Sequence, residues 1–136
     1  MKITGEELLK RFIAGERNFN RVFVKKSRNE LLFQGVDLSG INLERATLSV
    51  DFSGATMRDS NFRYSVWGDH LSWEDIDFTG SDFTGINNAV GCVFTRCDFS
   101  ETIWSEADLW QSTFKDCTTW SANFYEARFS EVHFEK

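Results

Sequence analysis

Residues 92–116 read CVFTR CDFSE TIWSE ADLWQ STFKD, five consecutive units of five residues. A unit typically holds a small residue, a polar residue, a large apolar residue and two further polar residues. A helix would spread the large residues around its surface, and a strand would send alternate units to opposite faces. Because a five-residue unit cannot bury an apolar face alone, the units must stack on one another.

The same period extends over most of the chain, marked by the large central residue of each unit. It is broken by a step of four residues between Leu48 and Phe52 and by steps of six residues after Trp67 and after Asn88. Asn88 replaces a large central residue, so we expect a bulge or an edge loop there. The central positions are Phe33, Leu38, Leu43, Leu48, Phe52, Met57, Phe62, Trp67, Trp73, Phe78, Phe83, Asn88, Phe94, Phe99, Trp104, Leu109, Phe114, Thr119, Phe124, Phe129 and Phe134.

A square coil satisfies this spacing. If each unit forms one side and the chain turns after it, the first and third residues of every unit point inward. Four units, about twenty residues, complete one coil, and successive coils lie about 4.8 Å apart. We therefore predict an all-β solenoid of about five to six coils, a quadrilateral rod roughly 28 Å long.

The repeated unit resembles that of the pentapeptide repeat family, commonly written A(D/N)LXX. Ala46-Thr47-Leu48, Ala107-Asp108-Leu109 and Ala122-Asn123-Phe124 carry the resemblance, which covers roughly residues 17–136. Members of this family are right-handed quadrilateral β-helices, so the resemblance implies the same handedness for this chain.

The first sixteen residues predict a capping helix. Thr4-x-x-Glu7 forms a capping box, and Gly15 is placed to end the helix. Between them, one apolar face is expected from Leu8, Leu9, Phe12 and Ile13. We expect residues 1–16 to cover the first coil of the β-helix formed by residues 17–136, as one domain overall.

The last coil has no comparable cover in the sequence. Its central residues, Phe124, Phe129 and Phe134, continue to within two residues of the end of the given sequence. We therefore expect a partly bare apolar face there and end-to-end dimerisation of two copies through it.

Composition indicates one soluble domain without direct nucleic-acid binding. The 136 residues are 41% apolar and 15% aromatic, which is enough to fill one core. A formal net charge of −6 favours a neutral or basic partner. No apolar run approaches a membrane span, and the N-terminal MKITGEELLKRF is too charged for a secretory signal. We expect a cytoplasmic protein that binds no membrane.

The cysteines fall on inward positions. Cys92, Cys97 and Cys117 each occupy the small first position of a unit, where a buried thiol acts as a small apolar group. Cys97 and Cys117 should stack on neighbouring coils, close enough for a disulfide on distance alone, although a reducing cytoplasm favours free thiols. With no His in a matching inward column, we predict no metal site.

Residues 67–75 gather His, Ser and carboxylate side chains. Asp69, His70 and Glu74 suit either a catalytic constellation, which requires a pocket, or a bulged corner with exposed polar residues. A rod filled with Phe and Trp leaves no evident cavity, so we favour the bulge. We predict no enzyme, no catalytic residue and no cofactor, and a solvated basic loop at residues 25–30.

Outward positions supply candidate contact residues. Acidic residues expected on one side are Asp37, Asp59, Asp77, Asp98 and Glu101. That side is either a docking face for a basic partner or a solvated face that aids solubility. Outward aromatic residues are Trp110, Trp120 and Tyr125.

Opposite charges should also stack between neighbouring coils. The expected pairs are Arg96 with Asp116, Asp108 with Arg128 and Lys115 with Glu135. Each pair would stabilise the stack by about 0.2 to 1 kcal/mol.

Together these features favour a non-enzymatic protein–protein interaction or scaffold module whose partner is a protein that the sequence leaves unidentified. The family resemblance implies an alternative, since some members mimic DNA and bind type II topoisomerases such as gyrase. Duplex DNA carries about sixteen charges over 28 Å, far more than the net charge of this chain.

Overall fold

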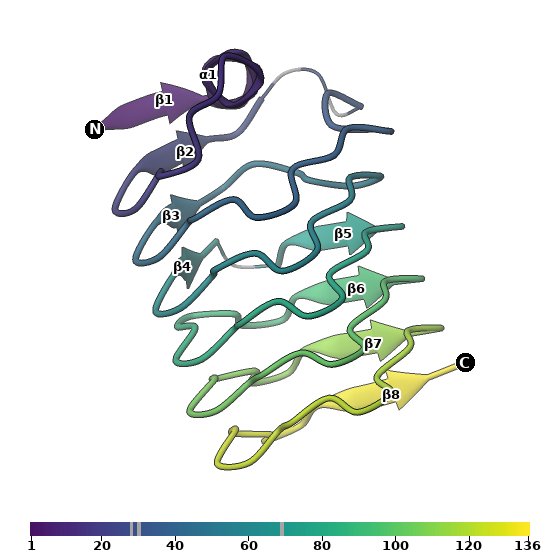
Figure 1. Ribbon diagram of the computed structural model, residues 1–136. Coiled ribbons are helices and arrows are strands. Elements are labelled where there is room, and N and C mark those ends of the chain that lie inside the picture. Colours follow the sequence, from purple (N-terminus) through teal and green to yellow (C-terminus); the bar gives the residue numbers. More distant parts are fainter. Residues whose placement is uncertain (28, 30, 69) are drawn as a thin grey trace.

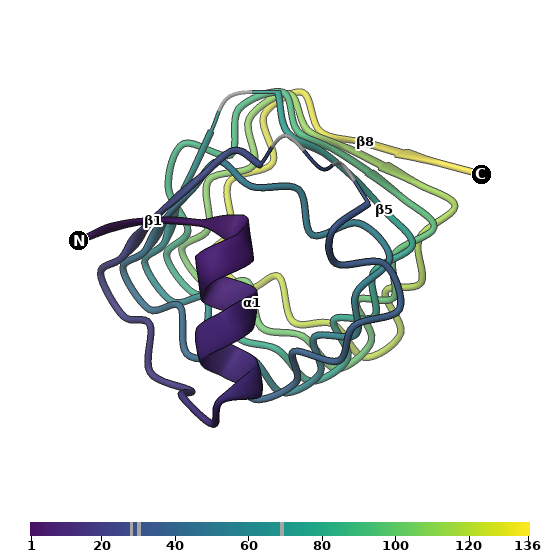
Figure 2. The same cartoon turned by 90° about the horizontal axis from the view of Figure 1, so that it is seen from above.

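The computed structural model describes residues 1–27, 29, 31–68 and 70–136, which wind as successive coils from one end of a rod to the other (Figure 1). Seen from the N-terminal end, the chain runs clockwise as it recedes, so the coil is right-handed (Figure 2). The predicted quadrilateral β-solenoid is confirmed. Its described elements are β1 (Lys2–Thr4), α1 (Gly5–Ile13), β2 (Phe23–Lys25), β3 (Thr47–Leu48), β4 (Val66–Trp67), β5 (Ser72–Glu74), β6 (Val93–Thr95), β7 (Thr113–Lys115) and β8 (His133–Glu135).

Parallel pairing between coils produces four faces. Face 1 carries the sheet β1-β2-β3-β4 and face 2 the sheet β5-β6-β7-β8. Isolated parallel bridges align the coils on the other two faces. Face 3 has the central residues Leu38, Met57, Phe78, Phe99 and Thr119, and face 4 has Phe19, Leu43, Phe62, Phe83, Trp104 and Phe124. The chain visits the faces in the order 4, 1, 2, 3.

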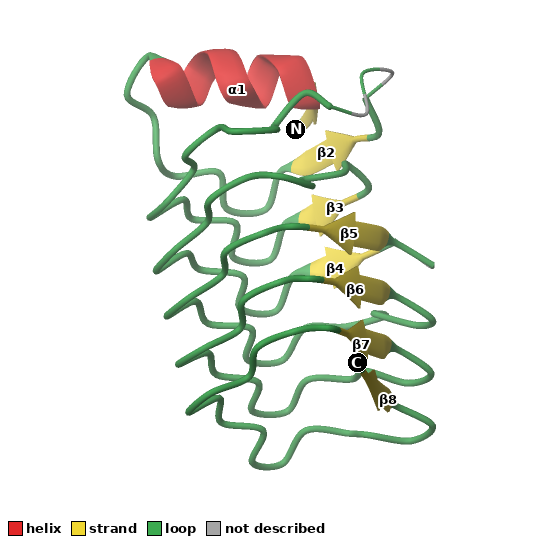
Figure 3. Cartoon of the chain, turned by 90° about the vertical axis from the view of Figure 1, so that its right-hand side faces the viewer, coloured by secondary structure: helices red, strands yellow, loops and turns green. Residues whose placement is uncertain are grey.

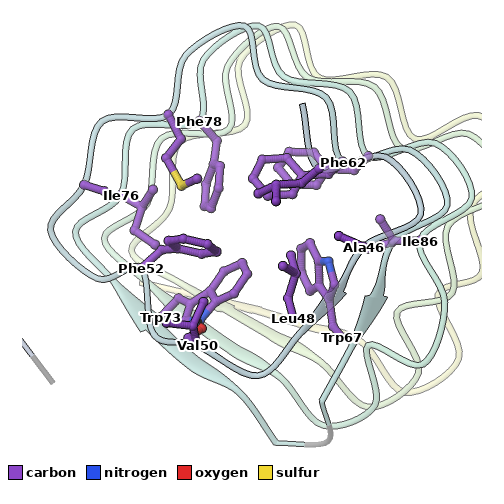
Figure 4. Packing of buried hydrophobic residues seen from close by; sticks show 14 of the residues in the cluster. Ala46, Leu48, Val50, Phe52, Phe62, Trp67, Trp73, Ile76, Phe78 and Ile86 are labelled. Carbon is purple, nitrogen blue, oxygen red and sulfur yellow. Dashed lines mark hydrogen bonds between the residues drawn. The ribbon is translucent and has the colours of Figure 1, made fainter. Parts of the chain in front are cut away.

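The core is a set of aromatic stacks along the rod axis (Figure 4). Phe78 lies over Phe99 with ring centroids 5.1 Å apart, and Phe83 lies over Trp104 at 4.3 Å. Edge-to-face contacts join the faces, as between Phe83 and Phe99 at 5.8 Å. Such pairs add about 0.5 to 1.5 kcal/mol beyond the area that they bury.

The predicted inward register holds through the middle of the rod, with one local error at Leu31. Central residues from Phe33 to Phe114 are buried, apart from Asn88. Asn88 is exposed in a left-handed conformation and Ala89 takes the inward place, so the expected bulge is present. Leu31, expected to point inward, is 67% exposed, because it begins a turn and Leu32 packs on the core instead.

At most corners the residue two positions after the central residue adopts the left-handed conformation, although Val50, two positions after Leu48, does not. Arg45 (φ 57°), Tyr64 (φ 55°) and Glu106 (φ 60°) are examples without glycine. This conformation is unfavourable for a residue with a Cβ and persists only where the surrounding structure imposes it. Hydrogen bonds between coils do so: the Tyr64 amide donates to the Thr84 carbonyl at 2.8 Å.

Helix α1 lies across the first coil and covers the core (Figures 2 and 3). The Glu7 amide donates to Thr4 Oγ1 at 3.1 Å, and Leu8 and Phe12 are buried. Ile13, expected on the same apolar face, is 74% exposed at the end of the helix. Gly5 is tightly packed, since a Cβ there would lie 3.0 Å from side chains of the first coils.

Strand β1 was not expected from the sequence. It precedes the helix and pairs in parallel with β2, aligning Ile3 with Val24. The leading residues thus add a strand to face 1 as well as a helix over the core.

We predict that Phe99→Ala lowers the free energy of unfolding by about 3 to 5 kcal/mol, because the ring is fully buried between Phe78 and its neighbours. Ser100→Ala, at the next and outward position, should change it by less than about 0.5 kcal/mol. Urea denaturation followed by tryptophan fluorescence measures both. Equal effects would contradict the register.

Candidate functional site

Face 3 and its corner carry the five predicted acidic residues. Asp37, Asp77 and Asp98 lie in one bridged column, alternating in part with Thr56 and Thr118. Asp59 and Glu101 occupy left-handed corner positions at the end of the same face. The acidic column is therefore discontinuous. Arg58 interrupts it further, since its Nη1 lies 3.3 Å from Asp77 Oδ2.

The column carboxylates also shape the backbone. Asp98 Oδ1 accepts a hydrogen bond from the Ser100 amide at 2.9 Å, and Asp37 accepts one from the Ser39 amide. Hydrogen bonding by Ser39 lowers the pKa of Asp37 below its ordinary value. Asn42, at the same position of a unit on face 4, likewise accepts a hydrogen bond through its side-chain Oδ1 from the Glu44 amide. Part of the acidic character of face 3 thus serves turn formation.

Two of the predicted aromatic residues are highly exposed near the C-terminal end. Trp120 on face 3 is 80% exposed and Tyr125 on face 4 is 72% exposed, while Trp110 lies on face 1 and is partly covered. Single exposed apolar residues are ordinary, but these two flank the last coil. They therefore extend whatever apolar surface that coil presents.

The last coil presents such a surface. Phe134 stacks on Phe114 at 4.9 Å, and Phe124 stacks on Trp104 at 5.6 Å, each from one side. Phe134 is 56% exposed, Phe129 is exposed and Phe124 is partly buried. At the opposite end α1 covers the equivalent surface (Figure 3). One end of the rod is therefore covered by a helix, whereas the other exposes aromatic rings.

A hollow of about 390 Å³ lies at the corner between faces 1 and 2. Residues from three coils line it: Lys26, Ser27, Asn29, Ser49, Asp51, Gly68, His70, Leu71, Ser72 and Trp73. The sequence did not predict a hollow here. Its lining comes from described residues of two irregular segments, at residues 26, 27 and 29 and at 68 and 70–73, and from Ser49 and Asp51 on the coil between them.

The predicted catalytic set does not converge in that hollow. His70 lines it, with its ring over Gly91, where a Cβ would lie 2.5 Å from Nδ1. Glu74 lies outside the lining and contacts Arg96, with Glu74 Oε2 at 3.7 Å from Nη2. Asp69 lies outside the described residues. Among those described, no hydrogen bond joins His70 to a serine that could act as a nucleophile.

The expected stacking of charges is correct in register, but among the described residues none of the three expected pairs forms an ion pair within 4.0 Å. Asp108 aligns with Arg128, and Lys115 with Glu135. Arg96 stacks above Asp116 but binds Asp75 on the preceding coil, with Nε 2.8 Å from Oδ1. This hydrogen bond lowers the pKa of Asp75.

The three cysteines are in the thiol form at packed positions. Cys97 is buried and lies next to Cys117 on the following coil. The hydrogen bond with Cys117 and burial raise the pKa of Cys97, so its thiol stays protonated. Cys117 is half-buried, and its Sγ donates to the Phe94 carbonyl at 3.2 Å.

Residues 1–27, 29, 31–68 and 70–136 contain no cluster of three metal-binding His, Cys, Asp or Glu side chains. They also include no helix with the length and apolar character needed to cross a bilayer.

Comparison with known families gives a match to pentapeptide repeats. The family model matches in eight copies, over residues 32–63 and 92–135. The search of curated proteins gave no match.

Solved structures similar to this chain include pentapeptide repeat proteins. A crystal structure of one from Nostoc PCC 7120 has a TM-score of 0.54 at 19% identity, covering 98% of this chain and 97% of that one. QnrB1, a plasmid-mediated fluoroquinolone resistance protein, has a TM-score of 0.44 at 20% identity, covering 85% of this chain and 64% of its own. At these identities the likeness concerns the fold.

We predict that a maleimide labels Cys117 before Cys97 in the native protein at neutral pH. The thiolate is the reacting form, and the raised pKa of Cys97 suppresses it, whereas Cys117 is less buried. Mass spectrometry of timed samples measures the order. Cys117→Ser should remove the fast phase, and denaturant should make all three sites react. Equal native rates at Cys97 and Cys117 would contradict the packing.

Proposed function

This chain belongs to the pentapeptide repeat family, and from that premise we propose that it is a non-enzymatic protein–protein interaction module. The observation that carries the proposal is the bare apolar end of the rod. Exposed contiguous apolar surface on a protein of this size commonly marks a contact site. A stacked rod also presents its side chains on a rigid support, which lowers the entropic cost of binding.

The proposed occupant of the bare end is a second copy of the chain, joined end to end. In the inner coils, central rings contact a ring on the next coil as well as one on the coil before. A partner would supply the contact on the open side that is missing from the last coil, at Phe124, Phe129 and Phe134. The last coil also ends the parallel ladder, so its outward-facing backbone groups can pair with another edge. Trp120 and Tyr125 would border this contact.

Face 3 is the proposed surface for a further protein partner with basic character. Asp37, Asp77 and Asp98 share one column, and Asp59 and Glu101 lie at its corner. Complementary charge would mainly speed and orient such an encounter. Trp110, on face 1, lies apart from this surface and from the bare end.

The dispersal of the reactive side chains among the described residues supports a non-enzymatic role. His70 and Glu74 point to different neighbours, and Cys97 is held as a buried thiol. We further propose a cytoplasmic location, where the cysteine thiols stay reduced.

A DNA mimic that binds a type II topoisomerase is the second candidate, and the acidic column on face 3 is the observation that favours it. The column is weak for this purpose, since Thr56 and Thr118 interrupt it and Arg58 pairs with Asp77. It lacks the regular charge spacing of a DNA strand.

We predict that the protein dimerises at about 100 µM and that Phe134→Ser weakens this dimer about tenfold or more, because it removes the most exposed ring of the end. Light scattering in about 1 M NaCl measures it, since salt at this level screens charge contacts but leaves apolar ones intact. Trp110→Ser is the matched control and should have little effect. A wild-type monomer under these conditions would exclude the end-to-end contact.

The second candidate predicts inhibition of DNA gyrase in a supercoiling assay. On the leading proposal we expect no inhibition up to tens of micromolar protein. Inhibition that Asp77→Lys and Asp98→Lys abolish would instead establish the DNA mimic.

A further inference from the structure

The edge where face 4 meets face 1 has an ordered column of corner residues. From the first coil to the last, this Arg/Glu edge reads Arg21, Arg45, Tyr64, Gly85, Glu106 and Glu126. The bridges Asn18–Asn42–Asn61–Asp82–Ile103–Asn123, three positions earlier on each coil, fix the alignment. The edge lies just before β2, β3 and β4, at the left of Figure 2.

Like charges are neighbours along this edge. Arg21 stacks on Arg45, and Glu106 on Glu126, at the backbone spacing of about 4.8 Å. Like charges in such positions destabilise a sheet. The edge between faces 2 and 3 is built oppositely: Asp75, Arg96 and Asp116 alternate in sign, and Arg96 binds Asp75 within the chain.

The charges of the Arg/Glu edge remain largely available. Among the described residues, no ion pair involves Arg21, Glu106 or Glu126, and all three are exposed. Arg45 has a weak contact, with Nη1 3.8 Å from Glu44 Oε1, and its guanidinium lies 5.0 Å from the Tyr64 ring. Both leave its outer side exposed.

The order of the charges is self-complementary when the column is reversed. Arg21 then faces Glu126, Arg45 faces Glu106, and Tyr64 faces Gly85. We propose that two copies of this chain associate side by side and antiparallel along the Arg/Glu edge, about a two-fold axis between the third and fourth coils. Each ion pair occurs twice by symmetry, as in any isologous contact.

The charge of the whole chain favours the same arrangement. Residues 1–67 hold 11 basic and 8 acidic residues, a net charge of +3, whereas residues 68–136 hold 4 and 13, a net charge of −9. An antiparallel partner places the basic half of one copy beside the acidic half of the other. A parallel partner would oppose like halves.

The side chains beside the edge tolerate this contact. On face 4 the reversed column places Arg63 opposite Thr84 and Glu44 opposite Ser105, without like charges. The edge between faces 3 and 4 would fail the same test, because Asp59 would face Glu101. The match therefore distinguishes the Arg/Glu edge from the edge between faces 3 and 4.

The centre of the Arg/Glu edge suits a close approach. Gly85 has φ 67°, and a Cβ there would lie 2.5 Å from the Tyr64 ring, so the ring lies across the glycine. Two Tyr64 side chains would then meet at the two-fold axis, flanked by the ion pairs. Tyrosine and arginine are enriched in the centres of protein interfaces.

This contact goes beyond the proposed function and uses a different surface. An antiparallel pair points its two C-terminal ends in opposite directions, which leaves both free. The two contacts also respond oppositely to salt, because ion pairs are screened and apolar contacts are not.

The test is sedimentation equilibrium of the full chain carrying Phe134→Ser, which removes the end contact. We expect a dimer in about 0.1 M NaCl that weakens at least tenfold in about 1 M NaCl, where the Debye length falls from about 10 Å to about 3 Å. Arg45→Glu alone and Glu106→Arg alone should each weaken it about tenfold or more, and the double variant should restore it to within about threefold.

Glu101→Arg is the matched control, with the same charge change at a left-handed corner of the neighbouring edge, and it should not weaken the dimer. Circular dichroism verifies that each variant is folded. A monomer in about 0.1 M NaCl at 100 µM or so, a dimer insensitive to salt, or a double variant as weak as the single ones would each overturn the proposal.

Discussion

One backbone constraint underlies most of the rod: a unit must turn a corner, and at most corners one residue adopts a left-handed conformation. Arg45, Tyr64 and Glu106 do so despite their Cβ atoms, at a cost of about 1 to 3 kcal/mol each. Hydrogen bonds between coils hold each corner in place, as from Tyr64 to Thr84. Because each corner is fixed from above and below, no coil is stable alone, and the rod stands as one cooperative stack.

The same constraint leaves only the outer surface of the rod available for binding. With the first and third residues of each unit turned inward, aromatic rings such as Phe78 and Phe99 fill the interior. What remains variable is the outer columns, the irregular corners and the ends. The bare end at Phe134 and the Arg/Glu edge are the two surfaces that we propose for self-association: at one a ring lacks its second neighbour, and at the other like charges are stacked.

Much of the fold was predictable from the sequence, and the reason is periodicity. The five-residue period predicted the inward register from Phe33 to Phe114, and the capping box at Thr4 predicted α1. The errors lie where local pattern is ambiguous. Leu31 occupies the first position of a unit, which predicts an inward side chain, but it begins a turn. Strand β1 is so short and polar that its sequence could not be distinguished from residues that simply precede a helix. The hollow beside His70 arises from two distant irregular segments, which no local pattern connects.

The sequence by itself determined which side chains point inward, because that depends only on position within a unit. Tertiary structure decided which outward side chains meet. Aligned residues on successive coils are 24, 19, 21, 21 and 20 positions apart along face 4, from Asn18↔Asn42 to Ile103↔Asn123. The four- and six-residue steps in the sequence already give the last four of these coil lengths. Only the folded side chains decided that Arg96 binds Asp75 and not Asp116, because that choice depends on side-chain geometry and not on the register.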